Sequence, residues 1–330
     1  MERVPVPLTP LAAAAHRRDR EAFARDVQYY LGLSPKQLPS RYFYDPLGSC
    51  LFEAICRLPW YEITRAERRL LLAHAGAVGR VLRPRATLVE LGCGSGEKLA
   101  ALVQDLALSP SDISLHLIDV SSTALALSAR ALDGLCASVT SHQATYEEGL
   151  DRMADLARGA GTTLVLFLGS NIGNFDPPAA DALLRRIRGA LISGDVLLLG
   201  ADLVKPEREL LLAYDDPLGV TAAFNKNLLV RINRELDGNF DLEMFDHRAI
   251  WNPVASRVEM HLVSRGPQVT RIPVAEIAAR FEARECIWTE SSYKYQPDEI
   301  VGIVTPTGFL LVDQWIDLAA RFALTLFAAA

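Results

Sequence analysis

Residues 90–96 read Glu-Leu-Gly-Cys-Gly-Ser-Gly, between an apolar run that begins near residue 85 and a helical pattern at 98–108. Glycines between a strand and a helix permit a tight turn and let a ligand approach the backbone closely. Asp119 ends the next apolar run, and a carboxylate there can accept hydrogen bonds from both hydroxyls of a ribose. The combination predicts a nucleoside-binding site at the ends of two strands.

The spacing of the glycines separates two kinds of nucleotide site. The dinucleotide fingerprint needs GxGxxG, whereas this chain has Glu97 at the sixth position. The observed ExGxGxG is similar to motif I of class I methyltransferases. An NAD or FAD enzyme is the main alternative for this loop.

Alternation of apolar runs and helical patterns indicates the fold class. Two further runs, LVLFLGS (164–170) and DVLLLGADL (195–203), are apolar throughout, as in strands that are covered on both faces. The alternation predicts an α/β protein with a doubly wound parallel sheet. Residues 205–290 break this rhythm and are interpreted as an inserted lobe. The chain ends on two strand-like runs within 308–329, typical of class I methyltransferases.

Composition excludes several functions. The chain has 330 residues, 50% of them hydrophobic, and a net charge of −6 without a basic stripe, so nucleic-acid binding is not expected. Its five cysteines are scattered and its six histidines lack metal spacing, which argues against a metal site or a disulfide framework. No apolar run reaches about 18 residues, so no membrane span is expected. We expect a cytoplasmic monomer that binds a small molecule.

Several longer motifs carry a family resemblance. They are RYFYDPLGS (41–49), LPWYEITRAE (58–67), ELGCGSGEK (90–98), FLGSNIGNF (167–175), DLVKP (202–206), AYDDPLGVTAAFNKNLL (213–229) and TESSYKY (289–295). In this order they resemble the histidine-specific methyltransferases of ergothioneine biosynthesis, over about residues 20–326. The resemblance implies a class I S-adenosylmethionine methyltransferase domain with a Rossmann-like sheet, and a smaller domain that closes over the amino acid. We expect the first at 66–204 plus 294–330 and the second at 1–65 plus 205–293.

The same resemblance implies a role for individual residues, with S-adenosyl-L-methionine as co-substrate and no metal. Cofactor binding falls to Tyr44, Gly92, Lys98 and Asp119, with Thr145 and Tyr146 at the adenine. Tyr44, Tyr61 and Asn174 are the expected catalytic residues, and Tyr61, Asn174 and Tyr214 surround the amino and carboxylate groups of the acceptor. Met260, Glu290 and Ser292 are expected at the imidazole ring. The chain departs from the family at Thr145-Tyr146, where the family has Asp-Phe, and at LPWYEITR, where LPEYYPTR is usual.

The ring-binding pair favours histidine as the acceptor. A neutral imidazole presents one N–H donor and one acceptor, which a carboxylate and a hydroxyl can satisfy. An apolar ring would leave the Glu290 carboxylate buried and unpaired, at a cost of a few kcal/mol. We therefore expect methylation of the α-amino group of L-histidine, with trimethylation to hercynine.

Three alternatives remain open at this point. A methyltransferase of the same family could act on another free amino acid, such as tryptophan. A catalytically silent relative could serve as a sensor of the cofactor or of an amino acid. An NAD-dependent oxidoreductase is disfavoured by ExGxGxG. One local expectation concerns Thr64, which is a plausible helix N-cap because Glu67 follows three residues later.

Overall fold

A computed structural model describes residues 10–154 and 161–330 and divides the chain into two compact units. The larger unit comprises Tyr44–Thr221, Ala249–Glu259 and Ser291–Ala330, and the smaller one Met1–Phe43, Ala222–Arg248 and Met260–Glu290. These bounds differ from those expected for the two functional domains, because residues 44–65 and 205–221 pack with the larger unit. How cofactor and substrate binding divide between the domains stays a prediction.

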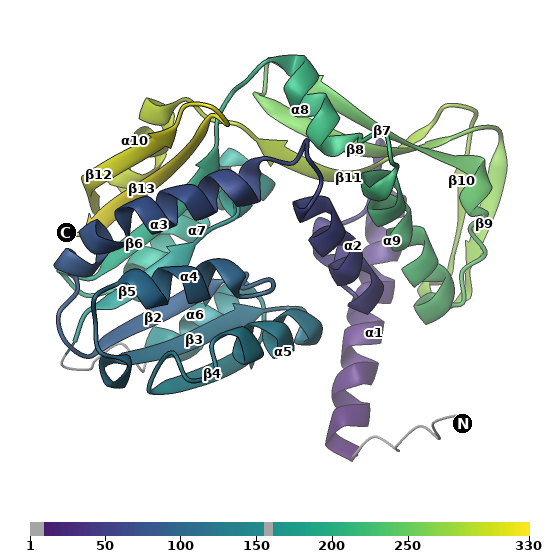
Figure 1. Ribbon diagram of the computed structural model, residues 1–330. Coiled ribbons are helices and arrows are strands. Elements are labelled where there is room, and N and C mark those ends of the chain that lie inside the picture. Colours follow the sequence, from purple (N-terminus) through teal and green to yellow (C-terminus); the bar gives the residue numbers. More distant parts are fainter. Residues whose placement is uncertain (1–9, 155–160) are drawn as a thin grey trace. The chain divides into compact units, whose positions relative to one another are not determined.

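A seven-stranded sheet forms the centre of the larger unit, in the order β12-β13-β6-β5-β2-β3-β4 (Figure 1). Its strands are β2 (Ala86–Leu91), β3 (Ile113–Asp119), β4 (Ser138–Gln143), β5 (Thr163–Phe167), β6 (Val196–Asp202), β12 (Phe309–Asp317) and β13 (Phe322–Ala329). Strands β2 to β6 are parallel, and β13 pairs antiparallel with both β6 and β12. This arrangement confirms the predicted α/β fold, including the final pair of strands.

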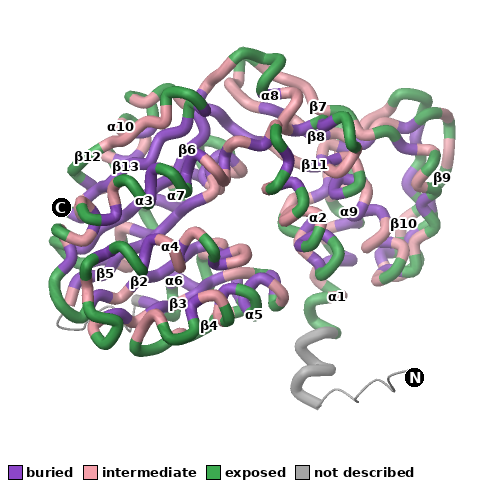
Figure 2. Tube along the Cα trace, in the orientation of Figure 1, coloured by how far each residue is buried: buried purple, intermediate pink, exposed green. Residues whose placement is uncertain are grey.

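Helices cover both faces of this sheet, which explains why its central strands are apolar throughout. The helices of the larger unit are α2 (Pro46–Cys56), α3 (Ile63–Val81), α4 (Glu97–Asp105), α5 (Ser122–Ala131), α6 (Tyr146–Ala154), α7 (Pro177–Gly189), α8 (Glu207–Tyr214) and α10 (Pro297–Val304), with short 3₁₀ turns η2 (Pro110–Asp112), η3 (Asn171–Asn174) and η6 (Thr305–Thr307). Leucines and isoleucines of α6, α7 and α10 join Phe167 and Phe327 in one core, while α3 packs on α4 and on β13. Figure 2 shows the buried course of these strands.

The smaller unit has its own aromatic core. Phe245 and Phe281 meet edge to face with ring centroids 5.2 Å apart, and Phe240 lies beside both. Its elements include α1 (Pro10–Leu31), η1 (Ser40–Phe43), η4 (Leu242–Met244), η5 (Pro273–Ala275), β9 (Gln268–Ile272) and β10 (Ile277–Phe281). Four elements have residues in both units: helix α9 (Val220–Leu236) and strands β7 (Phe245–Asn252), β8 (Arg257–Ser264) and β11 (Cys286–Tyr293). These three strands and β1 (Lys36–Gln37) form a sheet of order β1-β11-β8-β7.

The start of α3 differs from the expectation. Glu62 occupies the N-cap position and the helix begins at Ile63, without a side-chain cap. Glu67 is wholly buried and pairs with Lys98 of α4 instead. The expectation of a capping box between Thr64 and Glu67 is therefore wrong, because the Glu67 carboxylate forms an ion pair with a residue of another helix.

Within residues 10–154 and 161–330, no helix combines the length and the hydropathy that a membrane crossing requires. The same residues contain no group of three or more His, Cys, Asp or Glu side chains placed to hold a metal ion.

Asp195 fixes the amino end of the sheet, and we expect its replacement to lower the stability of the folded protein. Its buried carboxylate accepts hydrogen bonds from the backbone N–H of Thr163 (2.7 Å) and of Ile192 (2.9 Å). Asp195→Ala leaves both N–H groups buried without this partner, so the free energy of unfolding should fall by about 2–4 kcal/mol. Denaturant titration measures it, with the exposed Asp133→Ala as the control, expected within about 0.5 kcal/mol of the parent. Equal stability of the two variants would contradict this role.

Candidate active site

The backbone of the glycine loop has conformations and close contacts that residues with a side chain would not allow. Gly92, Gly94 and Gly96 all have positive φ, of 80°, 54° and 75°. A Cβ atom on Gly92 would lie 2.7 Å from the side-chain nitrogen of Asn171 and 2.8 Å from the Tyr146 hydroxyl. The loop follows β2 and leads into α4, at the edge where the parallel strands end (Figure 1). Both the turn and the close approach require glycine here.

Asp119, at the end of β3, is tied to this loop. Its carboxylate accepts hydrogen bonds from the backbone N–H of Ser121 (2.8 Å) and of Gly94 (3.4 Å). Burial raises the pKa of Asp119, and these N–H groups act in the opposite direction. The backbone thus holds a carboxylate beside the glycine turn, as the sequence predicts for a ribose-binding acid.

Lys98 lies in the first turn of α4 and forms an ion pair with the fully buried Glu67. The Glu67 carboxylate also accepts the backbone N–H of Gly169, at 2.7 and 2.9 Å from its two oxygens. Burial acts to lower the pKa of Lys98, but the Glu67 carboxylate outweighs it and the pKa is raised. Lys98 is therefore a cation, and Glu67 links it to the loop that follows β5.

Glu90 is the last but one residue of β2 and is 1% exposed. Within the described residues its Oε2 atom has no hydrogen-bond partner. Burial, together with the nearby carboxylates of Glu67 and Asp119, raises the pKa of Glu90 to about 8, although Lys98 opposes the shift. Glu90 is thus a proton-binding group beneath the glycine loop.

Helix α6 begins at Tyr146, and Thr145 directly precedes it. The Tyr146 ring packs edge to face on Phe167 at 5.5 Å, which places its hydroxyl beside Gly92. The Thr145 hydroxyl accepts the N–H of Glu148 (3.3 Å), and the Glu148 carboxylate accepts the N–H of Thr145 (3.2 Å). This is a capping box. An adenine contact by Thr145 stays a prediction, and its hydroxyl already has a structural task.

Asn174 lies in η3, which follows β5. Two bonds hold this segment: Ser170 accepts the N–H of Asp202 (2.9 Å), and Glu67 accepts that of Gly169. Ser170 itself has a positive φ of 59°. The segment is therefore fixed to β6 and to α3, and Asn174 is half-buried at the carboxyl edge of the sheet.

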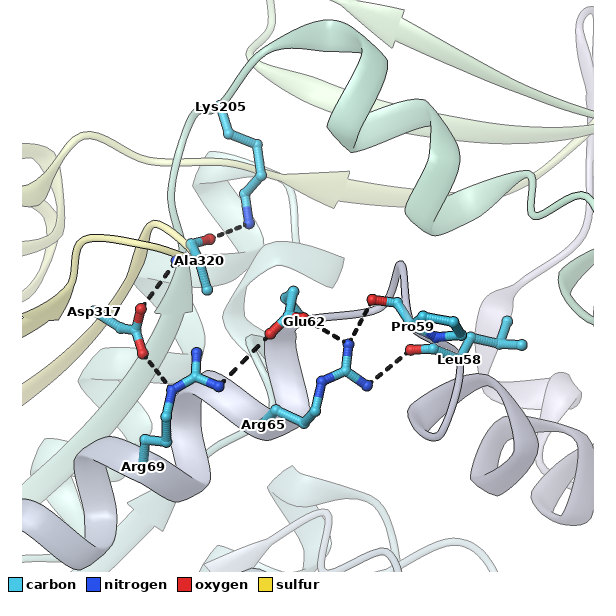
Figure 3. Close-up of polar contacts among 8 residues, drawn as sticks. All are labelled: Leu58, Pro59, Glu62, Arg65, Arg69, Lys205, Asp317 and Ala320. Atoms are coloured by element: carbon cyan, nitrogen blue, oxygen red, sulfur yellow. Dashed lines mark hydrogen bonds and ion pairs between the residues drawn. The ribbon is translucent and has the colours of Figure 1, made fainter.

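Tyr61 and Tyr44 meet at the Phe52 ring, Tyr44 at 5.6 Å and Tyr61 at 6.3 Å between ring centroids. Tyr61 belongs to the turn after α2, and Arg65 donates hydrogen bonds to the carbonyl oxygens of Leu58 (2.8 Å) and Pro59 (2.7 Å) in that turn. Figure 3 shows how this anchoring continues: Glu62 joins Arg65 to Arg69, and Arg69 binds Asp317 at 2.7 Å.

Tyr214 and Ser292 share a buried hydrogen bond of 2.8 Å between their hydroxyl oxygens. Tyr214 ends α8 and Ser292 lies in β11, and each accepts a hydrogen bond from Lys294. The Tyr214 ring faces Tyr61 at 6.4 Å. The sequence predicts both hydroxyls as substrate-binding, whereas Lys294 is not among the predicted residues, although it lies within the TESSYKY motif.

Met260 and Glu290 belong to the smaller unit. They lie on neighbouring strands, β8 and β11, and the Thr289 hydroxyl donates to the Met260 carbonyl (3.0 Å). Met260 is buried and Glu290 is half-buried. Their roles at the imidazole stay predictions.

The larger unit thus holds ten of the predicted site residues in two groups at one edge of its sheet. Gly92, Lys98, Asp119, Thr145 and Tyr146 follow or face β2, β3 and β4, and Asn174 follows β5. Tyr214 and Ser292 connect through Lys294 to Asp202 at the end of β6, and Tyr61 and Tyr44 join them through ring contacts with Tyr214 and Phe52. Glu67, Glu90, Asn171, Asp202 and Lys294 are polar residues of this edge that the sequence analysis did not select. All five lie inside the quoted motifs, which was the signal available.

Comparison with known proteins identifies the family. Residues 23–329 match the model of a family described as "Histidine-specific methyltransferase, SAM-dependent". The chain belongs to this family. It is 39% identical to the histidine N-alpha-methyltransferase of Mycobacterium tuberculosis, over 93% of this chain and 95% of the relative. The corresponding enzyme of Mycolicibacterium smegmatis is 37% identical, over 93% and 94%. A solved S-adenosylmethionine-dependent methyltransferase from Clostridium acetobutylicum is 11% identical, with a TM-score of 0.42 over 86% of this chain and 96% of that one.

The methyltransferase uses S-adenosylmethionine as co-substrate, and the residues at the carboxyl edge fit it. Gly92 lets the Asn171 side chain and the Tyr146 hydroxyl approach the backbone of the turn, Asp119 offers a carboxylate to the ribose, and Lys98 offers a cation to the carboxylate of the methionine part. These assignments for single residues remain predictions.

Glu90 gives the unfolding of the protein without cofactor a distinct pH dependence. Its folded pKa of about 8 exceeds the ordinary value of 4.5, so the folded state binds the proton more tightly. Stability contributed by the protonated carboxyl is complete below about pH 4.5 and is lost as the pH rises through 8. Glu90→Gln does not titrate, so its free energy of unfolding should gain on that of the parent from pH 5 to 8. Denaturant titration at several pH values tests this, with the exposed Glu97→Gln as the control; a pH-independent difference would contradict it.

Proposed function

We propose that this methyltransferase transfers three methyl groups to the α-amino group of L-histidine, giving hercynine, a step of ergothioneine biosynthesis. The supporting observation is the match of residues 23–329 to a histidine-specific family, with relatives of nearly equal length that carry the histidine N-alpha-methyltransferase name. The site agrees with it, because polar groups suited to an amino acid gather beside the predicted cofactor loop.

Positioning supplies most of the proposed catalysis. S-adenosylmethionine supplies a methyl group on a cationic sulfur, and its transfer is an in-line displacement that needs a neutral amine aimed at the methyl carbon. Asn174, on the segment fixed to α3 and β6, accepts a hydrogen bond from the amine through its side-chain oxygen. Tyr44 and Tyr61, oriented through Phe52, complete the amine site and lead its proton towards water.

Specificity is proposed to lie in three residues at the ring. Glu290 accepts the imidazole N–H, Ser292 donates to the other nitrogen, and Met260 packs beside the ring. The contacts of Ser292 support the donor role, because its oxygen receives a hydrogen bond from Lys294. We further propose that 66–204 plus 294–330 bind the cofactor, that 1–65 plus 205–293 bind the acceptor, and that the enzyme works as a cytoplasmic monomer.

Product masses test the proposed reaction. The protein is incubated with S-adenosylmethionine and each standard amino acid in turn, and mass spectrometry detects added methyl groups. We expect histidine to gain one, two and finally three methyl groups, and the other amino acids to stay unchanged. Methylation of tryptophan in place of histidine would support the related-acceptor alternative, and no methylation of any amino acid would support a sensor.

Glu290→Ala is expected to change acceptor preference more than turnover. The ring contacts are remote from the transferred methyl, so their loss should raise KM for histidine and leave kcat nearly unchanged. The change also removes the penalty on apolar rings, so the ratio of kcat/KM for histidine to that for tryptophan should fall by at least about tenfold, about 1.4 kcal/mol. Glu282→Ala, an exposed change in the same unit, is the control. An unaltered ratio would show that Glu290 does not read the ring.

A further inference from the structure

Lys294 is a deeply buried charged side chain beside Tyr214 and Ser292, two of the residues predicted to bind the acceptor amino acid. Its side chain has no exposed surface, and its ammonium is 2.8 Å from the Tyr214 hydroxyl, 2.9 Å from the Ser292 hydroxyl and 3.0 Å from an oxygen of Asp202. An ammonium has three hydrogens to donate, and these three partners can use all of them. Lys294 therefore acts on a ligand only through the groups that it holds.

The charges around Lys294 do not cancel. Asp202, 2% exposed, binds Lys294 through one oxygen and Lys205 through the other, at 2.6 Å. Lys205 is 9% exposed and donates onward to the Ala320 carbonyl, as Figure 3 shows. Two ammonium groups thus share one carboxylate, so this buried cluster carries a net positive charge that an anionic ligand would complement.

Stability gives no reason for this arrangement. Burying an ammonium is costly, and replacing a buried ion pair with apolar side chains of similar volume is often neutral or stabilising. Burial acts to lower the pKa of Lys294, but Tyr214 and Asp202 outweigh it and raise the pKa, so the ammonium persists. A cation retained at this cost beside two hydroxyls indicates a function.

The hydroxyls convey the charge of Lys294. Both oxygens accept hydrogen bonds from the ammonium, and one O–H of the pair is donated within the bond between them. When a ligand takes the place of that bond, the ammonium polarises both O–H groups towards donation. The Lys294 ammonium also lies 4.7 Å from the centre of the Tyr214 ring. Donors backed by a buried positive charge suit a carboxylate and disfavour a neutral carboxamide or an amine.

We propose that Lys294, held by Asp202, is a positioning residue that makes the Tyr214 hydroxyl selective for the α-carboxylate of the acceptor amino acid. The inference rests on the proposed function, because it takes the acceptor to be a free amino acid. It adds Lys294 and its counterion Asp202 to that function, and it explains why the acceptor should need a free carboxylate.

The test compares each acceptor with its carboxamide. The amino acid that the parent methylates best, expected to be histidine, and its α-carboxamide are assayed with the parent, Lys294→Met and Lys294→Arg. The parent should prefer the acid, and Lys294→Met should reduce that preference in kcat/KM by at least about tenfold. Lys294→Arg, which keeps the charge, should restore much of the preference.

The results test the role of Lys294 separately from the identity of the acceptor amino acid. If Lys294→Met lowers kcat/KM for acid and amide equally, the residue is only structural and the proposal is wrong; a parent without preference for the acid overturns it as well. Should Lys294→Met fail to fold, Tyr214→Phe must lose the preference instead, and its retention overturns the proposal. Methylation of an amino acid other than histidine would refute the histidine assignment alone, because the acid–amide comparison is made on whichever acceptor works.

Discussion

The Glu67 carboxylate accepts the Gly169 N–H with both oxygens and pairs with Lys98, and it does so with no exposed surface. A buried carboxylate without partners would cost several kcal/mol, so these contacts oblige α3, α4 and the loop after β5 to meet at one place. Strand β6 adapts to it as well: a Cβ at Gly200 would lie 2.0 Å from a Glu67 oxygen. The loop that carries Asn174 and the lysine beside the glycine turn are thereby fixed by one side chain.

This constraint explains how the edge of the sheet is divided. Chain order reverses between β2 and β5, and open α/β sheets bind ligands at such a point. On the β2–β3 side, the backbone N–H groups of Gly94 and Ser121 hold Asp119 beside the glycine turn. On the β5–β6 side, lysines hold Asp202. Glu67 stands at the junction, because it contacts both the α4 lysine and the β5 loop.

The sequence predicted the features that depend on chain order and failed on those that depend on distant partners. The glycine turn and Asp119 could be found because each follows directly on an apolar strand. Lys294 and Asp202 are separated by 92 positions, and no local pattern marks their pairing. Capping boxes illustrate the same limit: Thr64 and Glu67 have the spacing but form none, since Glu67 pairs with Lys98, whereas Thr145 and Glu148 form one that was not predicted from the sequence.

The charges on the β6 side also bear on how an amine could react without a strong base. Asn174 and the tyrosines are weak bases, so the acceptor ammonium must lose its proton through its surroundings. Nearby positive charge lowers the pKa of an ammonium, and a paired carboxylate loses its power to raise it. A net positive cluster that binds the acceptor carboxylate would do both, because it neutralises the anion that otherwise stabilises the adjacent ammonium. Under the proposed function, recognition of the carboxylate and release of the amine proton are therefore two consequences of the same buried lysine.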